Sequence, residues 1–315
     1  MNDIKVIVPG GLNTDIVGYG VKKLLGAGEL TLGGRLTIGP GGKARNMAQM
    51  AAVYLGRGRV AMIGRSSRDP NGLWKVPLAA LEEAGVDTSH VRVLGFEESG
   101  GKYPGVALIP VDRRGRNQIY VLPGVNEDFS SHDIENAEAL FKNPNRDKIL
   151  ILALEIPQPT AKHCLEKAVK SRIRVILDPG GIDVPLDDAF FRNTFLIKPN
   201  AYEAEILTGV KIMDFFTAEK ASRALRARGV QNVLITHGDK GAYFFNREDK
   251  IHIPCPEVTN TGIRDETGCG DQVTAILAAC LAEDMGLAEA AKKAVHAGTL
   301  QFCRTGVQPI QREEL

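Results

Sequence analysis

The segment 265–277 combines a flexible turn, a carboxylate and the start of an apolar helix. Gly268 and Gly270 flank Cys269, so the backbone can turn tightly and approach a ligand without a Cβ in the way. The apolar run after Asp271 predicts a helix whose first N–H groups and dipole form a cradle for an anion. Two interpretations of Asp271 are open. It caps the helix, or it accepts a proton from a hydroxyl that attacks a phosphoryl group in the cradle.

A second glycine-rich segment, 39–46, leads into a helix of small residues. Gly41 and Gly42 let the backbone touch a ligand, while Lys43 and Asn46 supply donors at the helix start. Such donors suit sugar hydroxyls or phosphate. The chain contains no G-x-x-x-x-G-K-[ST] segment, which excludes a P-loop.

Composition limits the classes of partner. The 315 residues include 39 Lys plus Arg and 38 Asp plus Glu, a net charge of +1, so no bulk field attracts nucleic acid or an anionic membrane. The five cysteines are scattered and include no C-x-x-C pair, which argues against a disulfide framework and a zinc site. No apolar segment approaches the roughly 18 residues of a membrane span, and the N-terminus leads into a strand rather than a signal peptide. We therefore expect a soluble, cytoplasmic protein that binds neither nucleic acid nor membrane.

Hydrophobic patterning predicts an α/β fold with a parallel sheet, because short apolar runs alternate with helical stretches. The expected strands cover 4–8, 60–63, 149–153, 174–177, 194–197 and 232–235. The expected helices cover 47–55, 73–84, 159–171, 201–208 and 217–228. A polar loop is expected over 65–72, and His237 is expected in a loop rather than as a metal ligand.

Polar residues follow most of these strands directly. They are Asn13 to Asp15, Glu155, Asp178, Lys198 to Asn200, and Thr236 to Asp239. Singly, each group is compatible with an ordinary turn. Together, at the carboxyl ends of parallel strands, they outline one crevice.

Two further stretches predict a separate β element. Residues 17–38 are rich in glycine and lack a helical period, and 106–122 has the alternation and turn chemistry of a hairpin. Pro110 suggests that its strand lies at a sheet edge. We expect a single domain over 1–315 in which about 12–40 and 100–123 form a lid.

With both glycine motifs in place, the chain resembles the ribokinase-like (PfkB) family of sugar and nucleoside kinases. The resemblance extends over nearly the whole length. It is carried by 11–15, 41–46, 124–126, 155–157, 178–179, 198–205, 236–241, 265–271 and 306–309.

This resemblance implies a three-layer α/β/α sandwich with a small β-sheet lid, through which two chains form a homodimer. It assigns the catalytic loop to Gly268, Cys269, Gly270 and the base Asp271. The sugar site would consist of Asn13, Asp15, Gly42, Lys43, Asn46 and Glu155. ATP would contact Asn200, Thr236, Gly238, Asp239 and Gly241. Mg²⁺ would be held through water by Glu203, and a monovalent cation such as K⁺ by Asp265.

The implied activity is transfer of a phosphoryl group from ATP to a primary hydroxyl of a furanose sugar, with ribose first. A nucleoside, fructose or a deoxy-sugar acid is the alternative acceptor. A non-catalytic sugar- or nucleotide-binding regulator is the alternative from another class, although Asp271 argues against it.

The chain departs from the family pattern at four places. Glu266 replaces a usual Thr, Cys269 a usual Ala and Ile310 a small polar residue, while the segment 64–69 lacks its second glycine. These changes lead us to expect differences in the acceptor and in the monovalent-cation site rather than in the reaction class.

Overall fold

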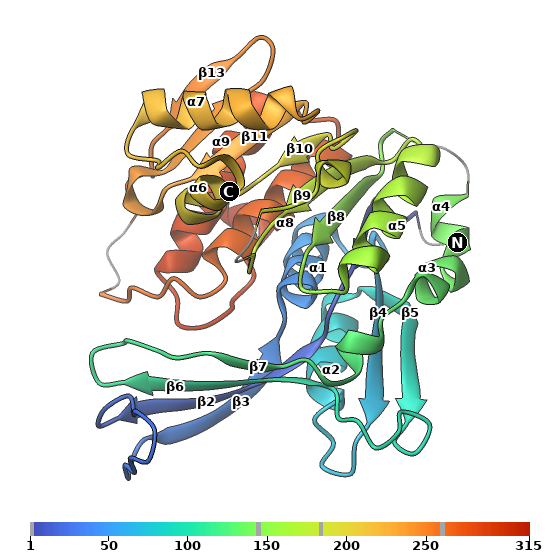
Figure 1. The fold of residues 1–315 in the computed structure, drawn as a ribbon, viewed down its shortest axis with the longest axis vertical. Helices are drawn as coiled ribbons and strands as arrows, with labels where there is room; N and C mark the ends of the chain where they lie inside the picture. Colours follow the sequence, from blue (N-terminus) through green and yellow to red (C-terminus); the bar gives the residue numbers. More distant parts are fainter. Residues whose placement is uncertain (1–2, 143–145, 183–184, 259–261) are drawn as a thin grey trace.

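The computed structural model describes residues 3–142, 146–182, 185–258 and 262–315. Its strands form two sheets. The larger has nine strands in the order β13-β12-β11-β10-β9-β8-β1-β4-β5, and the smaller has four in the order β3-β2-β6-β7. The small sheet extends away from the helices as an arm (Figure 1).

Most of the large sheet is parallel, as the alternation of strands and helices predicts. Its strands are β1 (Val6–Pro9), β4 (Val60–Arg68), β5 (Asp87–Gly95), β8 (Ile149–Ala153), β9 (Arg174–Asp178), β10 (Leu196–Ile197), β11 (Asn232–Thr236), β12 (Ala242–Phe245) and β13 (Lys250–Ile253). Every neighbouring pair from β5 to β11 is parallel. The strands β12 and β13 add an antiparallel edge that the sequence did not predict.

Helices cover both faces of the large sheet, which gives three layers. One face packs against α1 (Lys43–Leu55), α2 (Lys75–Ala84), α8 (Cys269–Ala282) and α9 (Leu287–Phe302). The other packs against α3 (Ser131–Asn136), α4 (Glu138–Phe141), α5 (Gln158–Lys170), α6 (Ala201–Thr208) and α7 (Phe215–Ala227). The predicted α/β/α sandwich is confirmed. Within the described residues, no helix is long and apolar enough to span a bilayer.

Side-chain alternation along β8 explains the continuous apolar runs. Ile149 and Ile151 join the core on the α1 and α8 side, whereas Leu150 and Leu152 join the core on the α5 side. Each of these side chains is fully buried. A strand buried on both faces must be apolar throughout, unlike a strand with one solvated face.

The small sheet consists of the two stretches expected to form a lid. Its strands are β2 (Asn13–Val21), β3 (Arg35–Gly41), β6 (Gly105–Asp112) and β7 (Tyr120–Leu122). The edge position expected for Pro110 is wrong, because β6 lies between β2 and β7. The proline is tolerated because β7 pairs only with residues 106–108 of β6.

The prediction of a polar loop over 65–72 is also partly wrong. Residues 65–68 continue β4 and pair with β5, and Ser66 and Ser67 are buried. Ser67 Oγ donates to the Lys102 carbonyl at 2.7 Å, which satisfies a hydroxyl that would otherwise be buried without a partner. The turn begins only at Asp69, whose Oδ1 accepts the Asn71 N–H at 2.9 Å.

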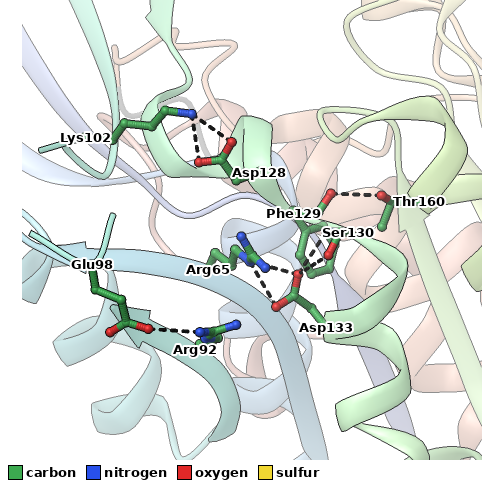
Figure 2. Close-up of polar contacts among 9 residues, drawn as sticks. All are labelled: Arg65, Arg92, Glu98, Lys102, Asp128, Phe129, Ser130, Asp133 and Thr160. Atoms are coloured by element: carbon green, nitrogen blue, oxygen red, sulfur yellow. Dashed lines mark hydrogen bonds and ion pairs between the residues drawn. The ribbon is translucent and has the colours of Figure 1, made fainter. Parts of the chain in front are cut away.

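A buried ion pair ties β4 to the helical layer. Arg65 Nε donates to both oxygens of Asp133, at 2.9 and 2.8 Å, and Asp133 also accepts the Ser130 N–H at the start of α3 (Figure 2). The two charged side chains are 13% and 2% exposed. Figure 2 also shows the pair Arg92–Glu98, whose side chains are 44% and 56% exposed.

These two pairs predict different losses of stability for the same substitution. Arg65→Met leaves the Asp133 carboxylate buried without its cation, so we expect the free energy of unfolding to fall by about 3 kcal/mol. Arg92→Met removes an exposed ion pair and should lower the free energy of unfolding by less than about 1 kcal/mol. Urea denaturation of both variants measures the difference. Equal losses would mean that burial of the Arg65–Asp133 pair does not increase its effect on the free energy of unfolding.

Candidate active site

Asp271 lies buried near the start of α8 and faces two donors from α1. Asn46 Nδ2 donates to its Oδ2 at 2.7 Å, and Lys43 Nζ lies 3.7 Å from its Oδ1. The helix begins at Cys269, three residues before the start after Asp271 that the sequence predicted. Gly268 is the N-cap residue, with φ +75°, and no side chain caps the helix. The capping interpretation of Asp271 is therefore wrong, and its carboxylate is available for chemistry.

The backbone around Asp271 turns as the glycines predict, but one donor of the expected cradle is already used. The Cys269 N–H donates to the Glu266 carbonyl at 3.2 Å within the turn. Burial, with the charges of Asp265, Glu266 and Asp271, raises the pKa of the Cys269 thiol to about 12. The thiol is therefore neutral at pH 7 and is not a nucleophile.

Lys43 connects the two motifs electrostatically. Its ammonium faces Asp271, and its backbone N–H donates to Glu155 Oε2 at 3.0 Å. The charge of Asp271 is the largest influence on Lys43 and raises its pKa, although burial acts in the opposite direction. Burial raises the pKa of Glu155, and the nearby Lys43 partly offsets this effect. Lys43 therefore remains a cation beside the candidate base.

A second buried ion pair lies beside the turn that contains Gly270. Lys198 Nζ is 3.1 Å from Asp178 Oδ2 and 3.3 Å from the Gly270 carbonyl. Thr274 Oγ1 donates to Asp178 Oδ2 at 2.5 Å. Sequence reasoning placed Asp178 and Lys198 at strand ends that outline one crevice but gave neither a specific role. Their contact with the turn at Gly270 depends on how α8 packs over the sheet, which no local pattern reveals.

The small sheet contributes Asn13 and Asp15 through β2. Asn126 Nδ2 donates to Asn13 Oδ1 at 2.8 Å, which fixes the amide so that its own NH₂ group is directed away from Asn126. The Asp15 carboxylate lies over Gly41, where a Cβ would stand 1.8 Å from Asp15 Oδ1. Burial raises the pKa of Asp15 to about 6, against the opposing charge of Arg45. Asp15 is therefore mostly ionised at pH 7.

Gly42 has a steric reason to be glycine. It precedes α1 with φ +93°, and a Cβ there would lie 2.9 Å from the Gly11 carbonyl. The chain can therefore pass close to β1 before α1 starts with Lys43. This close approach places Lys43 and Asn46 opposite α8.

The residues expected to contact a nucleotide lie along the other half of the large sheet. Asn200 and Thr236 form an isolated parallel bridge, and Asn200 begins α6. Asn200 and Glu203 form a reciprocal capping box, with Glu203 Oε2 accepting the Asn200 N–H at 2.9 Å. Burial raises the pKa of Glu203, which Lys198 partly offsets. The charges of Asp178 and Lys43 also act on the pKa of Glu203, so Glu203 belongs to the same charge cluster as these two residues.

The turn after β11 contains the other three expected nucleotide residues. Gly238 and Asp239 belong to a short 3₁₀ turn, and Asp239 is exposed. A Cβ at Gly241 would lie 2.1 Å from the Ile253 carbonyl, so only glycine fits there. Beside this turn, residues 252–256 and the α9 segment 289–296 line most of a hollow of about 530 Å³.

The carboxylate of Asp265 is hydrogen-bonded by backbone N–H groups. Its two oxygens accept the N–H groups of Thr267 and Gly306, at 2.9 and 2.8 Å. Burial acts to raise the pKa of Asp265, but these hydrogen bonds outweigh it and the pKa lies below its ordinary value. Gln301, which sequence reasoning missed, donates from Nε2 to the carbonyls of Thr267 and Gly306, at 3.1 and 2.6 Å. Among the described residues, no group of three or more His, Cys, Asp or Glu is arranged to hold a metal.

The sequence profile of the pfkB family carbohydrate kinases matches residues 3–314. The chain belongs to this family. It is an ATP-dependent carbohydrate kinase, as the resemblance implied.

Relatives of this pfkB-family kinase include sugar kinases of more than one specificity. The chain is 31% identical to a ribokinase of Haemophilus influenzae, over 98% of this chain and 96% of that protein. It is 29% identical to a deoxyribokinase of Salmonella typhi, over 97% and 94%. The structure of Arabidopsis thaliana ribokinase complexed with ribose and ATP superposes with a TM-score of 0.84 at 26% identity, covering 99% of this chain and 97% of that one.

The geometry predicts that Asp271→Asn will abolish most turnover. A general base of this kind contributes about 10² to 10⁴ in kcat, and ATP binding should change little. The amide can still accept a hydrogen bond from Asn46, so the packing should persist. Steady-state kinetics and the Kd for ATP give the two readouts. Asp188→Asn, which changes an exposed carboxylate paired with Arg228, is the matched control. Retained turnover in Asp271→Asn would remove this residue from the mechanism.

Proposed function

We propose that the chain transfers the γ-phosphoryl group of ATP to the primary hydroxyl of a furanose sugar, with ribose as the preferred acceptor. The observation that carries the proposal is the buried Asp271, which lies between Asn46 and Lys43 at the start of α8. The similarity to ribokinases, one of them complexed with ribose and ATP, supports ribose as the acceptor.

The polar groups around Asp271 suit a ring with several hydroxyls. Asp15 and Asn46 would hold neighbouring hydroxyls, Lys43 would donate to a ring oxygen substituent, and Glu155 would accept a further hydrogen bond. Asn13, oriented by Asn126, would add another donor. Such a pocket favours a sugar over an apolar base.

In the proposed reaction, Asp271 removes the proton from the primary hydroxyl as its oxygen attacks the γ-phosphorus. The new P–O bond forms while the bond to the ADP oxygen breaks. The Gly270 N–H and the positive end of the α8 dipole would stabilise the transferred group, and Lys43 would offset its charge. The proton stays on Asp271 until the product leaves.

ATP would lie along Asn200, Thr236, Gly238, Asp239 and Gly241, with Gly238 and Gly241 leaving room for close backbone approach. The hollow between residues 252–256 and α9 is lined by Ile253, whose backbone lies against Gly241, and it is a suitable place for the base.

Magnesium fits the donor chemistry on this side of the site. The charge cluster combines the carboxylates of Glu155, Asp178, Glu203 and Asp271 with the cations of Lys43 and Lys198, so it carries an excess of acidic groups. Mg²⁺ prefers oxygen ligands of this kind. Glu203 would hold it through water. The metal would neutralise charge on the phosphate oxygens.

The acceptor assignment predicts a ranking of substrates. We expect kcat/KM for ribose to exceed that for 2-deoxyribose, fructose, adenosine and cytidine, because a site with polar groups for hydroxyls leaves them unpaired with a deoxy analogue. Asp15→Ala should raise KM for ribose by the equivalent of about 1.5 to 3 kcal/mol, while KM for ATP stays unchanged. Coupled detection of ADP provides the measurement. A nucleoside, fructose or 2-deoxyribose preferred by more than tenfold would overturn ribose as the acceptor but not the kinase activity.

Potassium fits the site around Asp265 poorly. Both oxygens of Asp265 accept backbone N–H groups, and the carbonyls of Thr267 and Gly306 accept the Gln301 amide. Ile310 is buried in the core and offers no side-chain oxygen. We therefore propose that a cation adds little to the stability of this turn.

The expected result is a change in kcat/KM of less than about threefold, roughly 0.65 kcal/mol, when K⁺ replaces tetramethylammonium at constant ionic strength. Gln301→Ala, which removes the amide donor, should show a larger response to K⁺ under the same conditions. A strong potassium requirement in the unmodified protein would mean that the carbonyls open to admit the ion.

The outer face of the small sheet supports a homodimer. The paired residues Ile38, Ile16, Leu108 and Tyr120 form one apolar row across all four strands. Ile38, Leu108 and Tyr120 are 49%, 39% and 55% exposed. Because side chains alternate along β2, this row lies on the face opposite Asp15. An apolar face of this kind is suited to a second copy of the same sheet.

We expect sedimentation equilibrium to give twice the chain mass of 34.0 kDa. Ile38→Glu should yield a monomer, because it places a charge in the apolar row. Tyr202→Glu, at an exposed position of α6, should leave the dimer intact. A monomeric parent protein would refute the pairing.

A further inference from the structure

Arg45 is a fully buried arginine at the junction of the small sheet and α1. It is 0% exposed. Within the described residues, no carboxylate lies within the 4.0 Å of an ion pair with its guanidinium. A charge buried in this way must be compensated by hydrogen bonds, because desolvation of an ion is costly. Arg45 belongs to the segment 41–46 that carries the family resemblance, but the resemblance assigned this residue no role.

The hydrogen bonds of Arg45 join two parts of the molecule. Its Nη2 donates to the Pro40 carbonyl at 2.7 Å and its Nε to the Gly41 carbonyl at 3.2 Å, both at the end of β3. It also donates to Asn46 Oδ1 and Gln49 Oε1, both on α1. The guanidinium thus fixes the last residues of the small sheet to the helix that carries Lys43 and Asn46.

The bond to Asn46 determines which way that amide faces. An asparagine amide has two orientations that differ by exchange of O and NH₂, and they differ little in shape. Arg45 can only donate, so it requires Oδ1 on its own side. Nδ2 is then directed to Asp271, to which it donates at 2.7 Å. The opposite orientation would place two donors against each other and Oδ1 against the carboxylate.

The charge of Arg45 also acts on the acidic groups nearby. It lowers the pKa of Asp15 against the effect of burial, and burial lowers the pKa of Arg45 itself to about 10. Arg45 is therefore still a cation at pH 7, and its positive charge offsets part of the negative charge of Asp15 and Asp271.

We propose that Arg45 is a positioning residue that acts through Asn46: it fixes the Asn46 amide so that Asp271 is held in one orientation, and it makes this orientation depend on the end of the small sheet. This inference rests on the proposed role of Asp271 as base. A closing movement of the small sheet around a sugar would move the Pro40 and Gly41 carbonyls and thereby the same hydrogen-bond chain.

A double-mutant cycle on the full-length protein tests the proposal, with ribose and ATP as substrates. Arg45→Met keeps an unbranched apolar stem and removes every donor. We expect kcat to fall by about 10- to 100-fold while KM for ATP stays within about twofold. In an Asn46→Ala background, Arg45→Met should lower kcat by less than about threefold, because the residue through which it acts is absent. The same factor in both backgrounds would overturn the proposal.

Arg174→Met is the control variant. It makes the same substitution at a partly buried arginine elsewhere in the protein. Arg174 donates to the Leu281 carbonyl at 2.8 Å and packs on Phe195, away from the candidate site. It should lower thermal stability and leave kcat unchanged. If Arg45→Met does not fold, Arg45→Lys is used in the same cycle, since it keeps the charge but cannot form the same set of bonds.

Asp271→Asn separates this inference from the proposed function. If Asp271→Asn keeps full turnover, Asp271 is not the base and the proposed mechanism fails. If Asp271→Asn is inactive but the effects of Arg45 and Asn46 simply multiply, only the positioning inference fails. If Asp271→Asn is inactive and the Arg45 effect disappears with Asn46, both hold.

Discussion

The structure depends on compensating one carboxylate that is buried inside the protein. Asp271 is 5% exposed, and an isolated charge at that depth would become protonated or destabilise the fold. It is compensated by the Asn46 amide and the Lys43 ammonium, both from a helix more than two hundred residues earlier in the chain. The packing of α1 against α8 is therefore a requirement of the site as well as of the core.

Parallel strands explain why residues distant in sequence meet near this carboxylate. The strands β8, β9 and β10 run side by side in one direction, so Glu155, Asp178 and Lys198 all lie at or just past carboxyl ends at one edge of the sheet. A helix layer on each face leaves this edge as the accessible place for polar groups. The antiparallel β12 and β13 do not disturb the arrangement, because they extend the sheet beyond β11.

Glycines set the distance between the small sheet and the main body. Gly41 makes room for the Asp15 carboxylate, and Gly105 makes room for the Asn13 and Asn126 amides, to which a Cβ would approach within 2.1 and 2.2 Å. A larger residue at either position would push β2, and with it Asn13 and Asp15, away from Asp271. The small sheet and α8 are thus positioned by close backbone approach as well as by hydrogen bonds.

The sequence alone determined the parallel α/β sheet, the separate β element and the two glycine motifs, because these depend on local periodicity and turn chemistry. It also supplied most of the residue types in the candidate site, and the family resemblance added the three layers. The buried strand β8 and the helix α6 were predicted with their observed bounds. The sequence did not reveal that 65–68 continue a strand, since polar Ser66 and Ser67 lie buried against β5 and a loop that follows it. Only the tertiary structure decided the roles of Arg45, Gln301 and the Lys198–Asp178 pair. Each of these acts through contacts with segments far away in the chain, and the direction of a buried side chain is set by what packs around it.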